Sequence, residues 1–265
     1  ADPLELDYSR CGRTDKGVSA CGQVVALRLR ASKPAQTPLD YPTLINRYLP
    51  SDIRVLGWQS TASDTAGKDG DDGGDTAQFN ARFDATGRHY KYFFMQDGTY
   101  DLGRMARAAK HFIGEHDFRN FSKADESATT YVRRMDACFI DEDSFGGGLC
   151  ALNVVGSAFC WHQVRCMVAV LFLVGRGKLE ERDVAAFLNI GKHPNRPSYT
   201  MAREEPLLLH TCLYGRDSVG SKPFHLSPSA RERIAGHLTG LLSDLRIRMQ
   251  LVTETLALVA KPAEQ

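Results

Sequence analysis

The residues best suited to chemistry lie in one polar stretch near the start of the chain, residues 10–20 (RCGRTDKGVSA). The stretch holds two arginines, one lysine, one carboxylate and two glycines, with no helical spacing of apolar residues. Two glycines five residues apart indicate a loop that turns tightly or approaches a partner closely. Asp15 lies between cations, so we expect an ionised carboxylate that is a candidate nucleophile or base. Composition alone also allows an ordinary charged surface turn.

A second feature is an arginine in an otherwise apolar helix. The helix expected from Phe159 onward is apolar almost all round and should therefore be buried, and it contains Arg165. No acidic residue lies between Ser144 and Lys178. An unpaired buried charge costs several kcal/mol, so Arg165 must find its carboxylate across the fold.

A third feature is a strand with two tyrosines. Tyr90, Tyr92 and Phe94 alternate along residues 87–94 and therefore share one face. Tyrosines in such a strand usually pack in the core or against a neighbouring strand. Periodicity does not separate Tyr90 from Tyr92 as a candidate for a site.

These motifs together resemble the TruA family of tRNA pseudouridine synthases. Gly12 to Asp15, with Gly17 and Val18, match Gly-Arg-Thr-Asp-x-Gly-Val. Residues 81–92 match Ala-Arg-Phe-x-Ala-Thr-x-Arg-x-Tyr-x-Tyr, and the family's third motif carries an arginine in the helix of Arg165. The resemblance covers about residues 8–215. Ser19, where the family usually has histidine, resembles the eukaryotic branch of tRNA pseudouridine 38/39 synthases.

The resemblance implies a site. Asp15 would be the catalytic aspartate, Tyr90 rather than Tyr92 the active-site tyrosine, and Arg165 the buried ion-pair partner of Asp15. The residues expected to contact RNA or substrate, some of them from their place on a strand face, are Arg13, Arg28, Arg30, Arg82, Arg88 and the apolar Leu207. For the two strand arginines, at positions 28 and 30, a solvated sheet face is an equal alternative.

The implied reaction isomerises uridine to pseudouridine in the anticodon stem-loop of tRNA, at positions 38 and 39. It breaks the C1′–N1 bond and rejoins uracil through C5, so the family needs no cofactor and no catalytic metal. An alternative is a tRNA-binding or tRNA-folding module of the same fold that has lost catalysis, although Asp15, Tyr90 and Arg165 are all present. A carboxylate-dependent hydrolase would need a second carboxylate near Asp15, and no motif supplies one.

The implied fold is α+β, with two related halves whose mainly antiparallel sheets join and are flanked by helices, plus a C-terminal helical extension. The expected segments are residues 1–84, which include the loop and a Gly/Asp-rich insertion at 61–77, then 85–215, and the extension at 216–265. The residue patterns predict strands at 21–30, 53–58, 87–94, 131–141, 149–155 and 206–214. They predict helices at 40–49, 101–112, 159–174, 179–190 and from 227 onward.

The last helix carries apolar residues that alternate in steps of four and three from Ile234 to Val259, which predicts a coiled-coil-like seam. The seam would pack on the catalytic body or on a second subunit, and we favour the second subunit, hence a homodimer.

The composition limits which other classes of protein the chain could belong to. The chain has 265 residues, 43% of them hydrophobic and 25% charged, which excludes disorder throughout. The net charge is +1, but residues 61–77 carry −4, so the remainder carries +5, a modest excess that fits RNA binding without requiring it. The longest apolar run, Met167 to Val174, is too short to span a membrane.

Seven cysteines without a Cys-x-x-Cys pair predict reduced thiols in an intracellular compartment, the cytoplasm or nucleus. The chain begins at Ala1 without methionine and lacks the strand and helix with a Tyr-Asp-Gly motif that precede the loop in the family. We therefore expect a trimmed chain that lacks one strand of its first half.

Overall fold

A computed structural model describes residues 6–29, 39–61, 79–142, 144–215 and 224–260. The chain packs as two compact units, Ala1–Arg28 with Asp71–Ser221, and Leu29–Gly70 with Lys222–Gln265. Arg30 and all but the first residue of the Gly/Asp-rich insertion lie outside the described residues. The three segments expected from the family, 1–84, 85–215 and 216–265, divide the chain differently from these two units. They stay a prediction.

The first unit is built on a six-stranded sheet in the order β2-β8-β4-β7-β6-β5. All neighbouring strands run antiparallel except β2 and β8, which are parallel. The strands are β2 (Ser19–Ala20), β4 (Ala85–Met95), β5 (Gly114–Asp117), β6 (Val132–Asp141), β7 (Leu149–Gly156) and β8 (Leu207–Tyr214). The mainly antiparallel sheet with helices confirms the predicted α+β class. Three successive glycines with positive φ, Gly146 to Gly148, turn the chain between β6 and β7, as the sequence predicted.

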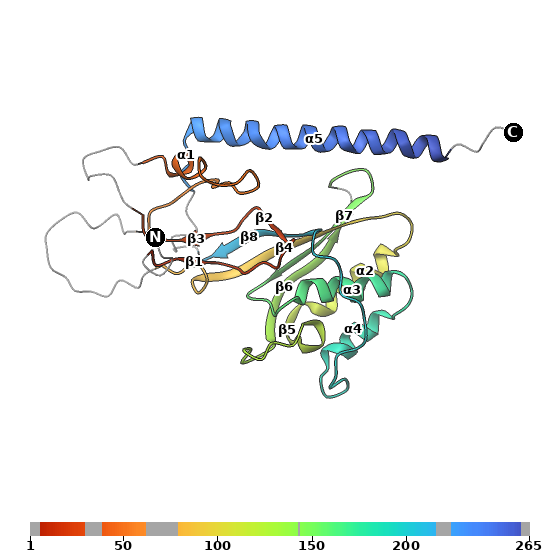
Figure 1. Ribbon diagram of the computed structural model, residues 1–265. Helices are drawn as coiled ribbons and strands as arrows, with labels where there is room; N and C mark the ends of the chain where they lie inside the picture. Colours follow the sequence, from red (N-terminus) through yellow and green to blue (C-terminus); the bar gives the residue numbers. More distant parts are fainter. Residues whose placement is uncertain (1–5, 30–38, 62–78, 143, 216–223, 261–265) are drawn as a thin grey trace, which may run out of the picture. The chain divides into compact units, whose positions relative to one another are not determined.

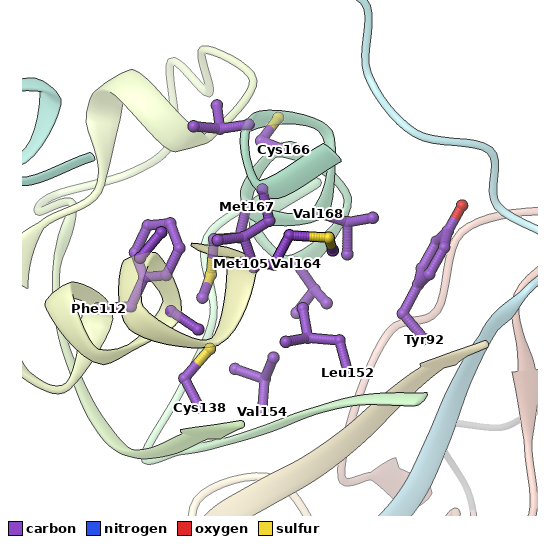
Figure 2. Close-up of a cluster of buried hydrophobic side chains, with 14 of the residues drawn as sticks. Tyr92, Met105, Phe112, Cys138, Leu152, Val154, Val164, Cys166, Met167 and Val168 are labelled. Atoms are coloured by element: carbon purple, nitrogen blue, oxygen red, sulfur yellow. The ribbon is translucent and has the colours of Figure 1, made fainter. Parts of the chain in front are cut away.

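Three helices of this unit gather beside the sheet (Figure 1). They are α2 (Leu102–Ala109), α3 (Gln163–Gly175) and α4 (Glu181–Leu188), with two short 3-10 turns at Lys110–Phe112 and Arg119–Phe121. Figure 2 shows Met167 of α3 and Met105 of α2 packed above Leu152 and Val154 of β7. Burying one side chain of this size stabilises the fold by about 1.5–3 kcal/mol. The apolar side chains of α3 thus hold this helix, which carries Arg165, against the sheet.

The start of the chain forms less strand than predicted. The strand expected over 21–30 is reduced to β3 (Val25–Ala26), which pairs with β1 (Ser9–Arg10) in a separate two-stranded sheet. Its apolar residues Val25, Leu27 and Leu29 are exposed, because an alternating pattern makes a half-buried strand only where a second layer covers one face. The strand expected over 53–58 is also wrong: only Trp58 pairs, in a single bridge to His225.

The second unit contains two helices, α1 (Tyr41–Ile45) and α5 (Pro228–Ala260). Asp40 caps α1 by accepting from the Thr43 amide at 3.2 Å, and Ser227 caps α5 by accepting from the Ala230 amide at 3.2 Å. The Ser227 hydroxyl also donates to Asp40 at 2.6 Å, which ties the two helix starts together.

The predicted helical extension is therefore present, and most of its apolar seam is exposed within its own unit. Leu245, Met249, Val252 and Leu256 are each more than 60% exposed. No helix among the described residues combines the length and apolar character needed to cross a membrane.

Candidate active site

The polar loop after β1 is fixed by hydrogen bonds to its backbone groups. The side-chain amide of Gln23 both accepts from the Gly12 amide at 3.1 Å and donates to the Gly12 carbonyl at 2.8 Å. The Val18 amide donates to the Asp15 carbonyl at 3.1 Å, closing a turn that contains Gly17 at φ +87°. A residue with a Cβ adopts that backbone conformation only with strain, so glycine permits the turn that presents Asp15.

The Asp15 carboxylate faces two side chains from the start of α3. His162 Nε2 lies 3.2 Å from Asp15 Oδ2, and Arg165 Nη1 lies 3.8 Å from the same oxygen. The Asp15 side chain keeps 28% of its surface exposed, whereas the side chains of His162 and Arg165 keep only 13% and 10%. The carboxylate is therefore backed by buried donors on one side and remains accessible on the other.

Arg165 lies within ion-pair distance of Asp15, as predicted, and has a second carboxylate partner that the sequence did not identify. Its shortest ionic contact runs from Nη2 to Glu204 Oε2 at 2.7 Å, and its Nε donates to the Ala202 carbonyl at 2.8 Å. Asp15 is within ion-pair distance but beyond hydrogen-bond distance. Nothing in the local sequence marked Glu204, because it lies 39 residues after Arg165 in the segment that leads into β8.

His162 was also missed as a candidate site residue. The sequence shows it three positions before Arg165, but a histidine at that spacing has no unique interpretation. The structure shows a left-handed backbone, φ +61°, immediately before α3. This conformation costs a non-glycine residue about 1–2 kcal/mol. It also explains why α3 begins at Gln163 and not at Phe159.

The two tyrosines that periodicity left equivalent occupy different surroundings. The Tyr90 ring packs edge-on against Phe159, with centroids 5.0 Å apart, and burial raises the pKa of its hydroxyl to about 12. A Cβ built on Gly12 would lie 3.7 Å from that hydroxyl, so Tyr90 reaches the polar loop. Tyr92 is 3% exposed and belongs to the main core, where it meets Phe172.

Arg88 connects several segments to the loop. Its guanidinium donates to the carbonyls of Cys11 at 3.0 Å, Ser157 at 2.8 Å and Arg82 at 2.8 Å, with a longer contact to the Ala85 carbonyl at 3.4 Å. These bonds hold the loop against the ends of β4 and β7. The RNA-contact role expected for Arg88 stays a prediction, and the structure adds a structural role for its guanidinium.

The other predicted RNA-binding residues differ in exposure. Arg13 and Arg82 are exposed, and Arg28, with a 70% exposed side chain, forms an ion pair with Asp7 at 2.5 Å. Leu207 is buried in the main core opposite Tyr92. The fully buried residue that lies opposite Tyr90, and 3.5 Å from a Cβ built on Gly12, is Leu209.

No group of three or more His, Cys, Asp or Glu side chains in the described ranges is arranged to hold a metal ion. All seven cysteines fall within those ranges and are free thiols. Cys11 of the loop is buried with Cys212, whose thiol lowers the pKa of Cys11 to about 6 while burial opposes the shift.

Comparison of the sequence with known proteins identifies relatives of this chain. Residues 108–215 match the family model described as tRNA pseudouridine synthase. The chain is 37% identical over 235 residues to the tRNA pseudouridine(38/39) synthase of Bos taurus, and 39% identical over 224 residues to that of Saccharomyces cerevisiae. These alignments cover 78% and 79% of this chain but 46% of each relative, so the chain spans about half their length.

A bacterial relative is covered more fully. The chain is 36% identical over 199 residues to the tRNA pseudouridine synthase A of Geobacter sulfurreducens, an alignment that covers 69% of this chain and 72% of the relative. The region matched by the family model, residues 108–215, contains four strands of the sheet, β5 to β8, together with α3 and the segment that supplies Glu204. The chain belongs to the TruA family of tRNA pseudouridine synthases.

Proposed function

We propose that this chain is the catalytic part of a tRNA pseudouridine synthase that isomerises uridine in the anticodon stem-loop at positions 38 and 39. The observation that carries the proposal is the partly exposed carboxylate of Asp15 on a fixed loop, backed by His162 and Arg165. The positions are supported by the names of the bovine and yeast relatives.

The geometry favours one oxygen of Asp15 as the reacting atom. His162 and Arg165 both approach Oδ2, so we assign the approach to the ribose to Oδ1. This oxygen would either attack C1′ or remove the C2′ proton as the C1′–N1 bond breaks. On the first route the uracil turns and C5 displaces the Asp15 oxygen from C1′; on the second, C5 bonds to C1′ and the removed proton returns to C2′. On both routes C5 then loses its proton and N1 gains one. Atoms balance without a cofactor, because the reaction is an isomerisation.

Tyr90 has two properties that suit a flipped uridine. Stacking a base on an aromatic ring returns about 1–3 kcal/mol, which offsets part of the few kcal/mol that unstacking costs. The raised pKa keeps the Tyr90 hydroxyl protonated at neutral pH, so we assign it the role of hydrogen-bond donor to the uracil.

The second carboxylate near the site does not favour hydrolysis. Arg165 holds Oε2 of Glu204 at 2.7 Å, so we assign Glu204 the role of ion-pair partner of Arg165 and not that of a second acid opposite Asp15. A hydrolase would leave an abasic site in the RNA, whereas a pseudouridine synthase leaves an unbroken modified nucleotide.

We further propose tRNA as the partner, bound through exposed cations that include Arg13 and Arg82, and a homodimer through α5 in a reducing intracellular compartment, cytoplasm or nucleus. Support for the dimer is the exposed seam around Leu245 and Val252. A monomeric mass at micromolar concentration in analytical ultracentrifugation would argue against the dimer.

The test of the activity uses the purified chain with an unmodified tRNA transcript and maps pseudouridine by chemical labelling and mass spectrometry. Wild type should modify positions 38 and 39, and Asp15→Asn should yield no product while binding tRNA normally in a gel-shift assay. Asp97→Asn, in an exposed turn, is the matched control and should keep full activity. Binding without product in wild type would instead support the catalytically inactive module, and an abasic product would support the hydrolase.

A further inference from the structure

His162 combines a strained backbone with a buried, one-sided imidazole. Asp7 and His162 alone have positive φ among the non-glycine residues that the structure describes. Such strain persists where the surroundings enforce it, and it gathers at functional sites. The left-handed conformation turns the chain directly before α3 and places the His162 side chain beside the loop that carries Asp15.

The two imidazole nitrogens have different environments. Nε2 lies 3.2 Å from Asp15 Oδ2, whereas Nδ1 is buried and has no hydrogen-bond partner in the described part of the chain. A proton on Nε2 therefore faces the Asp15 carboxylate at ion-pair distance, whereas a second proton on Nδ1 would be a buried donor without a partner. Burial lowers the pKa of His162, Asp15 opposes that shift, and the nearby cations Arg165, Lys123 and Arg196 reinforce it. The neutral tautomer with the proton on Nε2 fits these surroundings.

Arg165 does not fix the direction of the carboxylate by itself. Its Nη2 and Nε are committed to Glu204 and to the Ala202 carbonyl, and its Nη1 stays 3.8 Å from Asp15. At that distance the attraction is ionic and weakly directional. Of the two side chains, His162 has the nearer nitrogen, 3.2 Å from Asp15 Oδ2, so it is the group placed to set the carboxylate's orientation.

We propose that His162 is a positioning residue, whose neutral imidazole donates from Nε2 to Asp15 Oδ2 and thereby turns Oδ1 toward the ribose. This inference rests on the proposed role of Asp15. The left-handed backbone is then the device that aims the imidazole back at the loop. Misplacing a reacting group by about 1 Å can cost two orders of magnitude in rate, so the contact has a measurable kinetic consequence.

Two substitutions separate positioning from a structural role. His162→Gly removes the imidazole and also relieves the positive φ, so it should leave Tm nearly unchanged while kcat falls about 10–100-fold with KM for tRNA within about two-fold. His162→Gln keeps an N–H donor at similar reach without a titrating ring, and it should recover kcat to within about five-fold of wild type. Wild-type kcat in His162→Gly would overturn the proposal. Equal losses of kcat in both variants, accompanied by a lower Tm, would overturn it as well.

A measurement without turnover distinguishes this inference from the proposed activity. Nitrogen-15 NMR of the histidine side chains should show His162 as the Nε2-protonated tautomer, with resonances that shift in Asp15→Asn. An Nδ1-protonated tautomer, or resonances insensitive to Asp15→Asn, would overturn the contact. A wild-type chain without pseudouridine product but with this NMR signature would fail the proposed activity and retain the contact.

Discussion

Neutralising Glu204 measures how much its ion pair with Arg165 contributes to the stability of the site. Glu204→Gln keeps the size of the side chain and an oxygen acceptor but removes the charge that faces Arg165 at 2.7 Å. A hydrogen bond between charged groups contributes about 1.5–3 kcal/mol, and the Glu204 side chain is 38% exposed, so we reduce the expected loss to about 1–2 kcal/mol. For a domain of this size each kcal/mol lowers Tm by about 2–4 °C, which predicts a decrease of about 2–8 °C.

The assay is thermal unfolding followed by circular dichroism, combined with single-turnover kinetics. The matched control is Glu205→Gln at the neighbouring position, where an exposed pair with Arg203 should leave Tm almost unchanged. Activity of Glu204→Gln should fall less than about 10-fold, because Arg165 keeps its bond to the Ala202 carbonyl and its ionic contact with Asp15. Equal Tm values for both variants would refute the conclusion that Glu204 is the main partner of Arg165.

Three other perturbations follow from the geometry. Gly17→Ala should destabilise the fold by about 1–2 kcal/mol and reduce kcat, because φ is +87° and the new Cβ would lie 2.7 Å from Cγ of Glu204. The control is Gly98→Ala, at φ +85° with open space around it, which should show only the cost of the backbone conformation. Equal losses of kcat in the two variants would contradict a local effect of Gly17 on the site. Arg88→Met should lower the free energy of unfolding by about 2–3 kcal/mol, because the partly buried carbonyls of Cys11 and Ser157 lose their donor. An unchanged urea midpoint would contradict the role of Arg88 in holding the loop. Burial lowers the pKa of His162 and His210 from the usual 6.5, so below that pH the unfolded chain binds more protons than the folded chain. The contribution of these histidines to stability should be full above about pH 6.5 and should be lost as the pH falls from 6.5 through their lowered pKa values. A Tm that is flat between pH 7.5 and about 5 would contradict this prediction.

The parts of the fold that the sequence predicted are those with a strong local pattern. The alternation around Tyr90, the glycine run between β6 and β7 and the apolar surface of α3 each identify an element without knowledge of its partners. The strands expected near Val25 and Trp58 failed for the opposite reason. A strand needs a neighbour, and a short apolar alternation does not say whether one is available.

The candidate site was likewise predictable only where a residue pattern marks its members. The burial of Arg165 implied a distant carboxylate, and that reasoning was sound, but it could not choose between two carboxylates that lie far apart in the chain. The resemblance selected Asp15 because its motif is recognisable, whereas Glu204 belongs to no pattern that local physics would single out. His162 was visible beside Arg165, yet its importance depends on a backbone torsion that no residue spacing encodes.

The charges around Asp15 indicate a division of work between buried and exposed cations. Two carboxylates, Asp15 and Glu204, share one buried guanidinium, and burial keeps the nearby imidazole from adding a charge readily. Among the four side chains in contact, Asp15, Glu204, His162 and Arg165, the carboxylates therefore outnumber the permanent cations by one. The remaining cations of the loop, Arg10, Arg13 and Lys16, are exposed and have no place in the buried network. A phosphate backbone needs such exposed charges, because releasing its counterions supplies much of the binding free energy. In the proposed function, the loop would present the Asp15 carboxylate to the ribose and these exposed cations to the phosphates around it, while Arg165 stays engaged with Glu204 in the buried cluster.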